Sequence, residues 1–289
     1  MEDNDEFKKA ALSGLDLRSS NPAIAQLRNK FLTAARTGDT RVLKQAVEAF
    51  PKDIDIRIFN TTALHAAVIR KQPQAVTVLL QAGASPNVKD MDSVSSPMHE
   101  AAQNNDTFTL IQLIHKGGQV NLSGLYGTPA KFAVDANATK TLAVLLTHGA
   151  AAMKFDDDGH TLLHRAALMG RAESLDLLLS KDLDINARNR DGQTPLMVAV
   201  QEGKVTCAKT LLEHGADYRL VDDMRDTALD MIEGNGGNSE ATVEALQKLF
   251  RARISRDAAE AAAPFNDGAE SKVSVRRPLV LKNKPGPLR

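Results

Sequence analysis

Acidic and imidazole side chains come together in one stretch of this chain, where their types alone would suit a cation. Three aspartates occupy positions 156–158, Gly159 and His160 follow, and His164 comes four residues later. Carboxylates and imidazoles are common ligands of calcium and zinc. A calcium loop, however, places its acidic residues at alternate positions before the glycine, whereas these three are consecutive. The spacing is therefore wrong for calcium, and we expect a polar turn without a metal.

The other groups that could react or bind phosphate also lack the neighbours that such chemistry needs. Cys207 is the single cysteine and precedes the apolar pair Leu211–Leu212 in a helical pattern. We expect a buried core thiol, because a reactive one needs an electropositive, partly exposed setting. The glycine-rich run at 234–237 follows no strand and precedes no Lys-Ser or Lys-Thr. Neither G-x-S-x-G nor H-E-x-x-H occurs, so we predict no enzyme, cofactor, metal or small-molecule substrate.

Three histidines recur instead at long intervals. His65, His99 and His164 each follow a threonine or serine by three residues, yet they lie tens of residues apart. Histidines spread in this way do not form one set of metal ligands. Their recurrence indicates a repeated structural unit that places each of them in the same local surroundings.

The repeated unit is clearest between positions 159 and 186. Thr161 begins a short helix with an apolar face, and Gly170 ends it. The leucines at 175–179 mark a second helix, after which Asp184 leads into a polar turn. Two such short helices bury too little apolar surface to fold alone, so each unit must stack on its neighbours.

The start of the first helix recurs with a nearly constant spacing. Copies of this marker position lie 32 to 34 residues apart, at Asn29, Thr62, Ser96, Thr128, Thr161, Thr194 and Thr227. Five residues later, six of the seven copies carry alanine: Ala34, Ala67, Ala101, Ala133, Ala166 and Ala199. We therefore expect these alanines to occupy equivalent sites where neighbouring first helices meet.

These segments resemble the ankyrin-repeat family, whose units follow a T-P-L-H-x-A-A pattern with a period of about 33 residues. The resemblance covers roughly residues 29–250 and is carried by Thr62–His65, Thr128–Pro129, Thr161–His164 and Thr194–Leu196. It implies an all-α fold, an ankyrin-repeat solenoid of about seven stacked helix-turn-helix units with finger turns. It also implies that the three histidines are structural and bond across the loop of an adjacent unit. It implies no particular chemistry, because the family has many partners and no common reaction.

Composition divides the chain into four parts. We predict a flexible acidic N-terminus (1–20), a repeat domain (21–250), a helical extension (251–264) and a disordered basic tail (265–289). Asn21 is expected to cap the first long helix, with Pro22 at its first position. The tail carries six lysines or arginines after position 271 and no acidic residue there, which is typical of a disordered segment. In unit four, the residues at 135–138, Asn137 among them, replace the usual glycine turn, which indicates a looser interface or a surface shaped for a ligand.

The resemblance implies that partners meet the finger tips and the exposed places on the first helices. This mapping gives ten candidate partner-binding residues: Phe59, Ile69, Arg70, Val94, Leu125, Phe132, Arg165, Leu168, Met169 and Arg190. Seven of them are apolar where a lone solenoid would gain from polar groups, which is typical of a partner site. The arginines would supply polar anchors around this apolar stripe. The alternative is that some of these side chains pack beneath neighbouring fingers.

The favoured function is a non-catalytic adaptor that binds another protein through its concave face, as a monomer in the cytoplasm. The 36 basic and 36 acidic residues balance, so the overall charge does not favour nucleic acid. A first alternative is a scaffold whose basic tail binds an acidic partner, an anionic membrane or nucleic acid. A second is a bacterial effector delivered into a host cytoplasm, since the degenerate repeats and polar tail are similar to ankyrin-repeat effectors of intracellular bacteria. We expect no transmembrane helix and no secretory signal.

Asn186 is a candidate modification site. It follows Asp184 and lies eight residues after Leu178, a spacing that resembles the finger asparagines modified by an asparaginyl hydroxylase in eukaryotic ankyrin proteins. The alternative is that its side chain only forms hydrogen bonds within its own turn.

Overall fold

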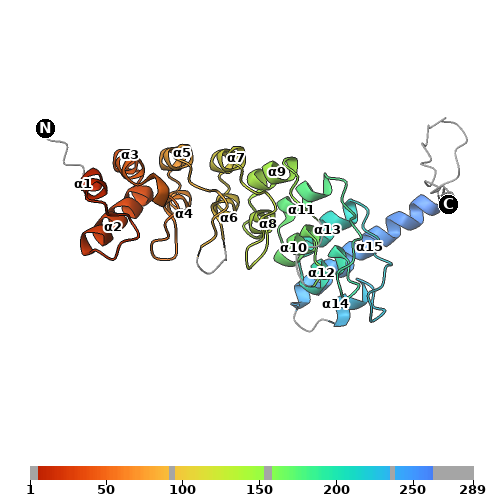
Figure 1. The fold of residues 1–289 in the computed structure, drawn as a ribbon. Helices are drawn as coiled ribbons and strands as arrows, with labels where there is room; N and C mark the ends of the chain where they lie inside the picture. Colours follow the sequence, from red (N-terminus) through yellow and green to blue (C-terminus); the bar gives the residue numbers. More distant parts are fainter. Residues whose placement is uncertain (1–5, 91–94, 153–157, 235–237, 263–289) are drawn as a thin grey trace, which may run out of the picture.

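The computed structural model describes residues 6–90, 95–152, 158–234 and 238–262, which form an elongated row of paired helices (Figure 1). In each pair an inner helix is followed, after a short turn, by an outer helix. The pairs are α2 (Pro22–Thr37) with α3 (Thr40–Ala49), α4 (Ala63–Ile69) with α5 (Pro73–Gln81), α6 (Pro97–Gln103) with α7 (Thr107–His115), α8 (Pro129–Asp135) with α9 (Thr139–Thr147), α10 (Leu162–Met169) with α11 (Ala172–Leu179), α12 (Pro195–Gln201) with α13 (Val205–Glu213), and α14 (Asp230–Gly234) with α15 (Glu240–Ala262).

The predicted all-α solenoid of about seven units is confirmed, since seven such pairs occur within the described residues. In Figure 1, α3, α5, α7 and α9 lie along the upper edge, their inner partners lie below, and the loops project beneath them. We call these loops, which precede the inner helices, the fingers. The described part of the chain contains no strand, only isolated bridges within three fingers. None of its helices has the length and apolar character that a membrane crossing requires.

Most inner helices begin at a residue whose side chain caps them. Thr62, Thr128, Thr161 and Thr194 have extended backbone, and each side chain accepts a hydrogen bond from the backbone N–H three residues later. Such a cap satisfies one of the N–H groups that a helix start leaves without an intrahelical partner. The threonine that marks the repeat in the sequence is therefore the residue that fixes where these helices begin.

In the first six pairs, the turn between the inner helix and its outer partner contains one residue with left-handed backbone. Gly170 takes this place in unit five with φ 67°, whereas Lys71, Asn105 and Asn137 take it in units two to four with φ 53°, 56° and 53°. The amide oxygen of Asn137 also accepts hydrogen bonds from the backbone N–H (3.3 Å) and hydroxyl (2.8 Å) of Ser174 in the next unit. Unit four is therefore joined firmly to unit five, and the looser interface is not observed.

Two rows of small and branched side chains form the core. The expected alanine row is confirmed where inner helices meet, with 0% exposure at Ala67, Ala101, Ala133, Ala166 and Ala199. A leucine row lies on the outer helices, also with 0% exposure, at Leu79, Leu113, Leu145, Leu178 and Leu211. Because a thin stack of helix pairs leaves little space between them, small side chains are needed where the backbones approach closely.

The N-terminal segment packs against the first pair, which differs from the flexible N-terminus predicted over 1–20. Helix α1 (Glu6–Leu12) buries Phe7, whose ring lies edge-on to that of Phe50 with 6.4 Å between centroids. Leu17 is buried as well. These two apolar side chains cover the end of the solenoid, where an unpaired helix face would otherwise meet water.

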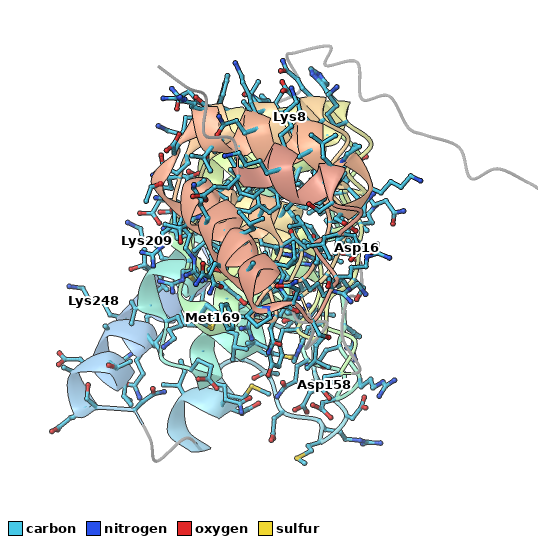
Figure 2. The ribbon with its side chains drawn as sticks, turned by 60° about the vertical axis from the view of Figure 1, so that its left-hand side comes forward. Lys8, Asp16, Asp158, Met169, Lys209 and Lys248 are labelled. Atoms are coloured by element: carbon cyan, nitrogen blue, oxygen red, sulfur yellow. The ribbon has the colours of Figure 1, made fainter. Side chains whose placement is uncertain are left out.

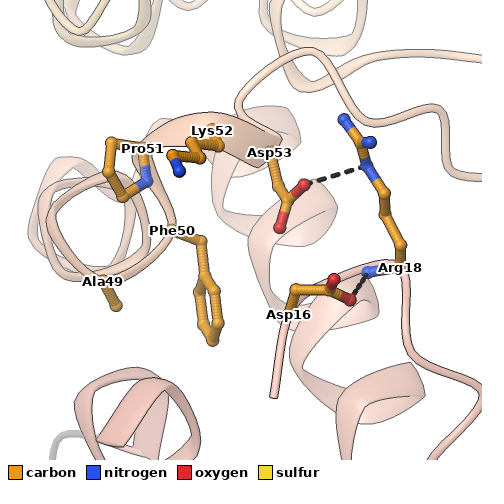
Figure 3. Close-up of a pocket in the computed structure, with 7 residues that line it drawn as sticks. All are labelled: Asp16, Arg18, Ala49, Phe50, Pro51, Lys52 and Asp53. Atoms are coloured by element: carbon orange, nitrogen blue, oxygen red, sulfur yellow. Dashed lines mark hydrogen bonds and ion pairs between the residues drawn. The ribbon is translucent and has the colours of Figure 1, made fainter. Parts of the chain in front are cut away.

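A carboxylate in the first loop fastens this segment. Asp53 lies in the short 3₁₀ helix η1 (Pro51–Asp53) and is buried. Its Oδ2 accepts a hydrogen bond from the backbone N–H of Leu17 at 3.1 Å. Figure 3 shows its Oδ1 paired with the guanidinium of Arg18, at 3.0 Å. Two contacts to one carboxylate hold the chain that leads from α1 into α2.

The opposite end of the solenoid is covered by α15, which is 23 residues long and runs on past the last inner helix (Figure 1). Its Leu246 and Phe250 are buried, and the ring of Tyr218 lies edge-on to Phe250 at 6.2 Å. The helix continues through Ala262, within the segment predicted as a helical extension. The basic tail predicted over 265–289 lies outside the described residues.

Candidate functional site

The exposed ends of the inner helices and the fingers form one side of the solenoid, which we call the inner face. Equivalent places on the inner helices carry Arg36, Ile69, Arg70, Gln103, Asn104, Asp135, Ala136, Leu168, Met169, Gln201 and Glu202. Figure 2 shows Met169 of α10 between Lys209, on an outer helix, and Asp158, on a finger. Four members of this row, Ile69, Arg70, Leu168 and Met169, are among the predicted partner residues, whereas Arg36 lies in the atypical first unit and was not predicted.

Three of the predicted residues come together near the N-terminal end of the inner face. They line a hollow of about 230 Å³, which we call the arginine hollow and which is formed by Arg36, Phe59, Thr61, Ala66, Ile69 and Arg70. The side chains of Phe59 and Ile69 are 76% and 47% exposed. Neither arginine has an ion-pair partner within the described parts of the chain. The hollow thus presents apolar surface beside two free positive charges.

Phe59 has a backbone conformation that a bulky residue rarely adopts. It occupies a two-residue turn with φ 49°, and Asn60 follows with φ 67°. The turn is closed where the backbone N–H of Ile58 donates to the carbonyl of Thr61 at 2.7 Å. Left-handed backbone costs a residue with a side chain roughly 1–2 kcal/mol. Since its ring is exposed, no burial in the free chain offsets this cost, which indicates a role outside the fold.

A charged cluster occupies the middle of the inner face. Asp135 on α8 pairs with Lys131 at 2.8 Å and with Arg165 of α10 at 2.5 Å. Arg171 also donates a hydrogen bond to the backbone oxygen of Asp135 at 3.0 Å. Arg165, predicted as a polar anchor for a partner, therefore already has a partner within the fold.

The apolar residues of the middle units are less available than the sequence mapping implied. Phe132 lies edge-on to the ring of His99 in the preceding unit, with 4.9 Å between centroids. Leu168 packs against the core, and Met169 is half-buried. Polar Gln103 interrupts the row between units two and four. Phe132 and Leu168 thus pack within the solenoid, as the alternative interpretation of the sequence expected. The predicted apolar stripe is not continuous along the inner face.

The fingers carry further exposed apolar side chains. Leu125 and Tyr126 share one finger tip and are 66% and 60% exposed, and Met224 on a later finger is 84% exposed. Tyr126 and Met224 are not among the predicted partner residues, although their apolar character at a finger tip was a signal that the mapping could have used. Arg190 is exposed as expected, and Val94 lies outside the described residues.

The three recurring histidines link consecutive units. Their Nε2 atoms lie 3.5, 3.0 and 3.0 Å from backbone oxygens in the next finger, those of Ser95, Gly127 and Gln193 respectively. Burial lowers the pKa of His65 to about 4, so its ring is neutral near pH 7. Burial also lowers the pKa of His99. The structural role predicted for His65, His99 and His164 is confirmed.

The cysteine and the possible metal ligands singled out in the sequence do not come together within the described residues. Cys207 is 1% exposed, and burial raises the pKa of its thiol to about 11, which confirms the core position. No group of three histidine, cysteine or acidic side chains lies close enough to hold a metal in the described ranges. Asp158 is exposed, whereas Asp156 and Asp157 lie outside those ranges.

Asn186 joins its loop to the next unit. Its Oδ1 accepts a hydrogen bond from the backbone N–H of Asp217 at 3.0 Å, and its own N–H donates to Asp184 at 3.0 Å. Asn87 and Asn121 form the same bond to the following units, with the N–H groups of Gln119 and Ala151 at 2.8 Å. The side chain therefore bonds between units rather than only within its turn.

Comparison with known protein families agrees with this architecture. Family models described as an ankyrin repeat, ankyrin repeats (3 copies) and ankyrin repeats (many copies) match residues 59–91, 98–189 and 177–232. Among solved structures, the ankyrin repeat domain of Bcl-3, described as a unique member of the IkappaB protein family, matches with a TM-score of 0.65. That match has 25% identity and covers 75% of this chain and 97% of the other. The human ASB11 ankyrin repeat domain, at 20% identity, shares the fold with a TM-score of 0.62, over 76% of this chain and 96% of that one.

Curated relatives match over part of their length. The chain is 34% identical to the Transient receptor potential cation channel subfamily A member 1 of Homo sapiens, over 57% of this chain and 16% of that protein. It is also 34% identical to the Nuclear factor NF-kappa-B p105 subunit of Gallus gallus, over 54% of this chain and 16% of the relative. The matched segments therefore span about a sixth of these relatives.

Proposed function

We propose that this chain, which belongs to the ankyrin-repeat family, is a non-catalytic adaptor that binds another protein through its inner face. The position of the exposed apolar side chains carries the proposal. Ten large hydrophobic side chains are exposed among the described residues, and six lie on fingers or an inner helix: Phe59, Ile69, Leu125, Tyr126, Val221 and Met224. Apolar groups concentrated on one side gain nothing from water, and such patches are typical of partner sites.

The proposal includes a monomeric protein of the cytoplasm with no small-molecule substrate. The single cysteine is buried with a free thiol, which suits a reducing compartment. The buried histidines and the paired Asp135 all have structural partners, which leaves surface complementarity as the means of recognition.

The test is affinity capture with the full chain from a lysate of the source cells, followed by hydrogen exchange on the purified complex. We expect slower exchange in the fingers and inner helices and unchanged exchange in α3, α5, α7 and α9. A finger variant, with Leu125→Ser, Tyr126→Ser and Met224→Ser, should capture less partner without a change in melting temperature.

The matched control replaces two exposed apolar side chains on other surfaces. Leu12 on α1 and Phe108 on α7 are 80% and 59% exposed, so Leu12→Ser with Phe108→Ser also removes exposed apolar side chains, but away from the inner face. The control should capture partner as the wild type does. Slower exchange confined to the outer helices, or an equal loss in both variants, would contradict binding through the inner face.

The basic tail supports a second candidate, a scaffold that binds an acidic partner, an anionic membrane or nucleic acid. Residues 272–289 carry six cationic side chains and no carboxylate, so binding through them should weaken steeply as salt is added. Deleting residues 265–289 from the full chain separates the two functions. Loss of capture by the truncated chain, with the wild-type inner face retained, would favour the tail.

Hydroxylation of Asn186 remains a separate prediction. Its side chain is half-buried and bonded to Asp217, so the modifying enzyme would need local opening of the loop. Incubation of the full chain with an asparaginyl hydroxylase, followed by peptide mass spectrometry, should show the mass of one added oxygen. An unmodified Asn186, under conditions where a known substrate peptide reacts, would end this prediction.

A further inference from the structure

We infer that the arginine hollow binds an acidic segment of the partner protein, in which one apolar side chain is flanked by aspartates or glutamates. This inference rests on the proposed function and adds the chemistry of the partner. The hollow of about 230 Å³ is smaller than the pockets of about 300–1,000 Å³ that usually enclose drug-sized ligands. It has space for a single side chain, so the rest of an occupant must lie along the surface.

The apolar part of the hollow indicates an apolar side chain. Phe59 reaches the hollow from a finger and Ile69 from the end of α4, and both are exposed in the free chain. Ala66, which is 3% exposed, belongs to the same lining. Covering these groups removes apolar surface from water, and the strained Phe59 turn gains a contact that the free chain does not provide.

The charges around the hollow indicate carboxylates beside that side chain. Arg36 and Arg70 are exposed and have no ion-pair partner among the described residues. The equivalent places of unit three carry uncharged Gln103 and Asn104, so no acidic side chain opposes the arginines along the row of units one to three. Arginine binds carboxylates through two parallel hydrogen bonds, which favours it over lysine for this task.

Charge distinguishes this end of the inner face from the rest. In unit four, Asp135 is already neutralised by Lys131 and Arg165, and in unit six the row carries Glu202. Around the arginine hollow, by contrast, two exposed arginines that have no ion-pair partner among the described residues lie beside the exposed apolar side chains of Phe59 and Ile69. This asymmetry favours the N-terminal units as the docking place of an acidic segment.

The spacing of the arginines suits an extended chain. Arg36 lies on α2 and Arg70 directly follows α4, and these are neighbouring inner helices. Packed helices lie about 8–10 Å apart, and an extended chain advances about 3.3 Å per residue. Carboxylates roughly three positions apart can thus reach the two arginines, while a residue between them places its apolar side chain against Phe59 and Ile69.

A selection on the full chain tests this chemistry with short peptides in place of the partner. The probe is a library of random dodecamer peptides displayed on phage, and the enriched peptides are then synthesised with a fluorescent label. We expect sequences in which an apolar residue lies between acidic residues. Their dissociation constants, measured by fluorescence polarisation, should rise at least tenfold for Arg36→Glu with Arg70→Glu, and less for Arg36→Lys with Arg70→Lys.

Two further variants make the result specific. Lys44→Glu with Lys248→Glu makes the same change in net charge at exposed sites on α3 and α15, and it should alter the dissociation constant less than twofold. Phe59→Asn keeps a residue that tolerates left-handed backbone while removing the ring, so it should weaken binding several-fold in a folded protein. Circular dichroism of each variant checks the fold.

The outcomes separate this inference from the proposed function. Enriched peptides without the acidic and apolar pattern, or peptides indifferent to the double arginine reversal, overturn the inference. If the peptides lose affinity only for the finger variant (Leu125→Ser, Tyr126→Ser and Met224→Ser), the proposed function stands, because the peptides still bind the inner face. The arginine hollow is then not the site for an acidic segment, and the inference is overturned. Equal dependence on Arg36 and Arg70 for a single-stranded oligonucleotide, with no effect of Phe59→Asn, would also overturn it in favour of nucleic acid.

Discussion

Arg165 on α10 contacts the carboxylate of Asp135 on α8 at 2.5 Å, so an ion pair joins two neighbouring inner helices in the middle of the inner face. Lys131 shares the same carboxylate at 2.8 Å. The side chains of Lys131, Asp135 and Arg165 are only 13%, 27% and 23% exposed. One acceptor thus serves two cations that are largely shielded from water.

Removing that acceptor should destabilise the solenoid more than removing either cation. Asp135→Ala leaves Lys131 and Arg165 without a counter-charge, and we expect the free energy of unfolding to fall by about 1–3 kcal/mol. Arg165→Ala should cost less, because Lys131 still pairs with the carboxylate. Urea denaturation measures both, with exposed Glu202→Ala as the control. Equal losses for Asp135→Ala and Glu202→Ala would contradict a structural role for the cluster.

This pairing changes how Arg165 should be tested as an anchor for a partner. Arg165→Ala should weaken partner capture by about 1–3 kcal/mol if its guanidinium also contacts the partner. Because the same change removes a contact between units, capture must be measured at a temperature where the variant is fully folded. If the variant captures as much partner as the wild type, Arg165 does not contact the partner and acts only within the fold.

Phe59→Gly should make the free chain more stable. Glycine adopts φ 49° without the steric cost that phenylalanine has there, and the exposed ring contributes no burial that would be lost. Because glycine also has more conformational freedom in the unfolded chain, part of this benefit is offset. We expect the free energy of unfolding to rise by about 0.5–1 kcal/mol. Thermal melting measures it. Phe59→Val is the matched control and should destabilise the fold, because a β-branched residue tolerates left-handed backbone poorly. A lower melting temperature for Phe59→Gly would show that the ring supports the fold.

The turns at Lys71 and Asn137 should respond in opposite ways to the same replacement. Both residues have φ 53°, but Asn137 also bonds Ser174 of the next unit through its amide oxygen. Lys71→Gly only relieves backbone strain, so we expect it to raise stability by a few tenths to about 1 kcal/mol. Asn137→Gly also removes three hydrogen bonds between units, two from Ser174 and one to Glu173, and a net loss of about 1 kcal/mol in unfolding free energy should follow. Chemical denaturation distinguishes the two variants, and equal shifts would mean that the bonds of Asn137 to Ser174 and Glu173 contribute nothing to stability.

The parts of this structure that repeat could be predicted from the sequence. The period placed Thr161 at a helix start and Ala166 where two helices meet, because each copy of the unit has the same requirement for a cap and for a small side chain. The same equivalence gave His164 its structural role, since its bond to the next finger recurs in units two and three.

The parts that occur once could not be predicted in the same way. Phe7 has no counterpart in the repeat, so its packing on Phe50 depends on a contact that only the folded end of the solenoid creates. The pairing of Arg165 with Asp135 joins different positions of two units, and the sequence does not fix how those side chains turn toward each other. Leu168 was mapped as exposed because the family pattern describes position, whereas its burial depends on the neighbouring unit.

Buried histidine should make the solenoid sensitive to mild acid. Burial holds the pKa of His65 at about 4 in the folded chain, below the ordinary value of 6.5 that applies after unfolding. Between these values the unfolded chain binds a proton that the folded chain does not, so stability is complete above pH 6.5 and falls as the pH drops toward 4. His65 alone should account for about 2 kcal/mol of lost unfolding free energy at pH 5 relative to pH 7.5. Urea denaturation at a series of pH values measures this loss. His65→Gln should lower stability at pH 7.5, because the hydrogen bonds of the ring to Thr62 and Ser95 are disturbed. The variant should nevertheless lose about 2 kcal/mol less unfolding free energy than the wild type between pH 7.5 and 5. If wild type and variant decline in parallel, His65 is not the group that titrates on unfolding.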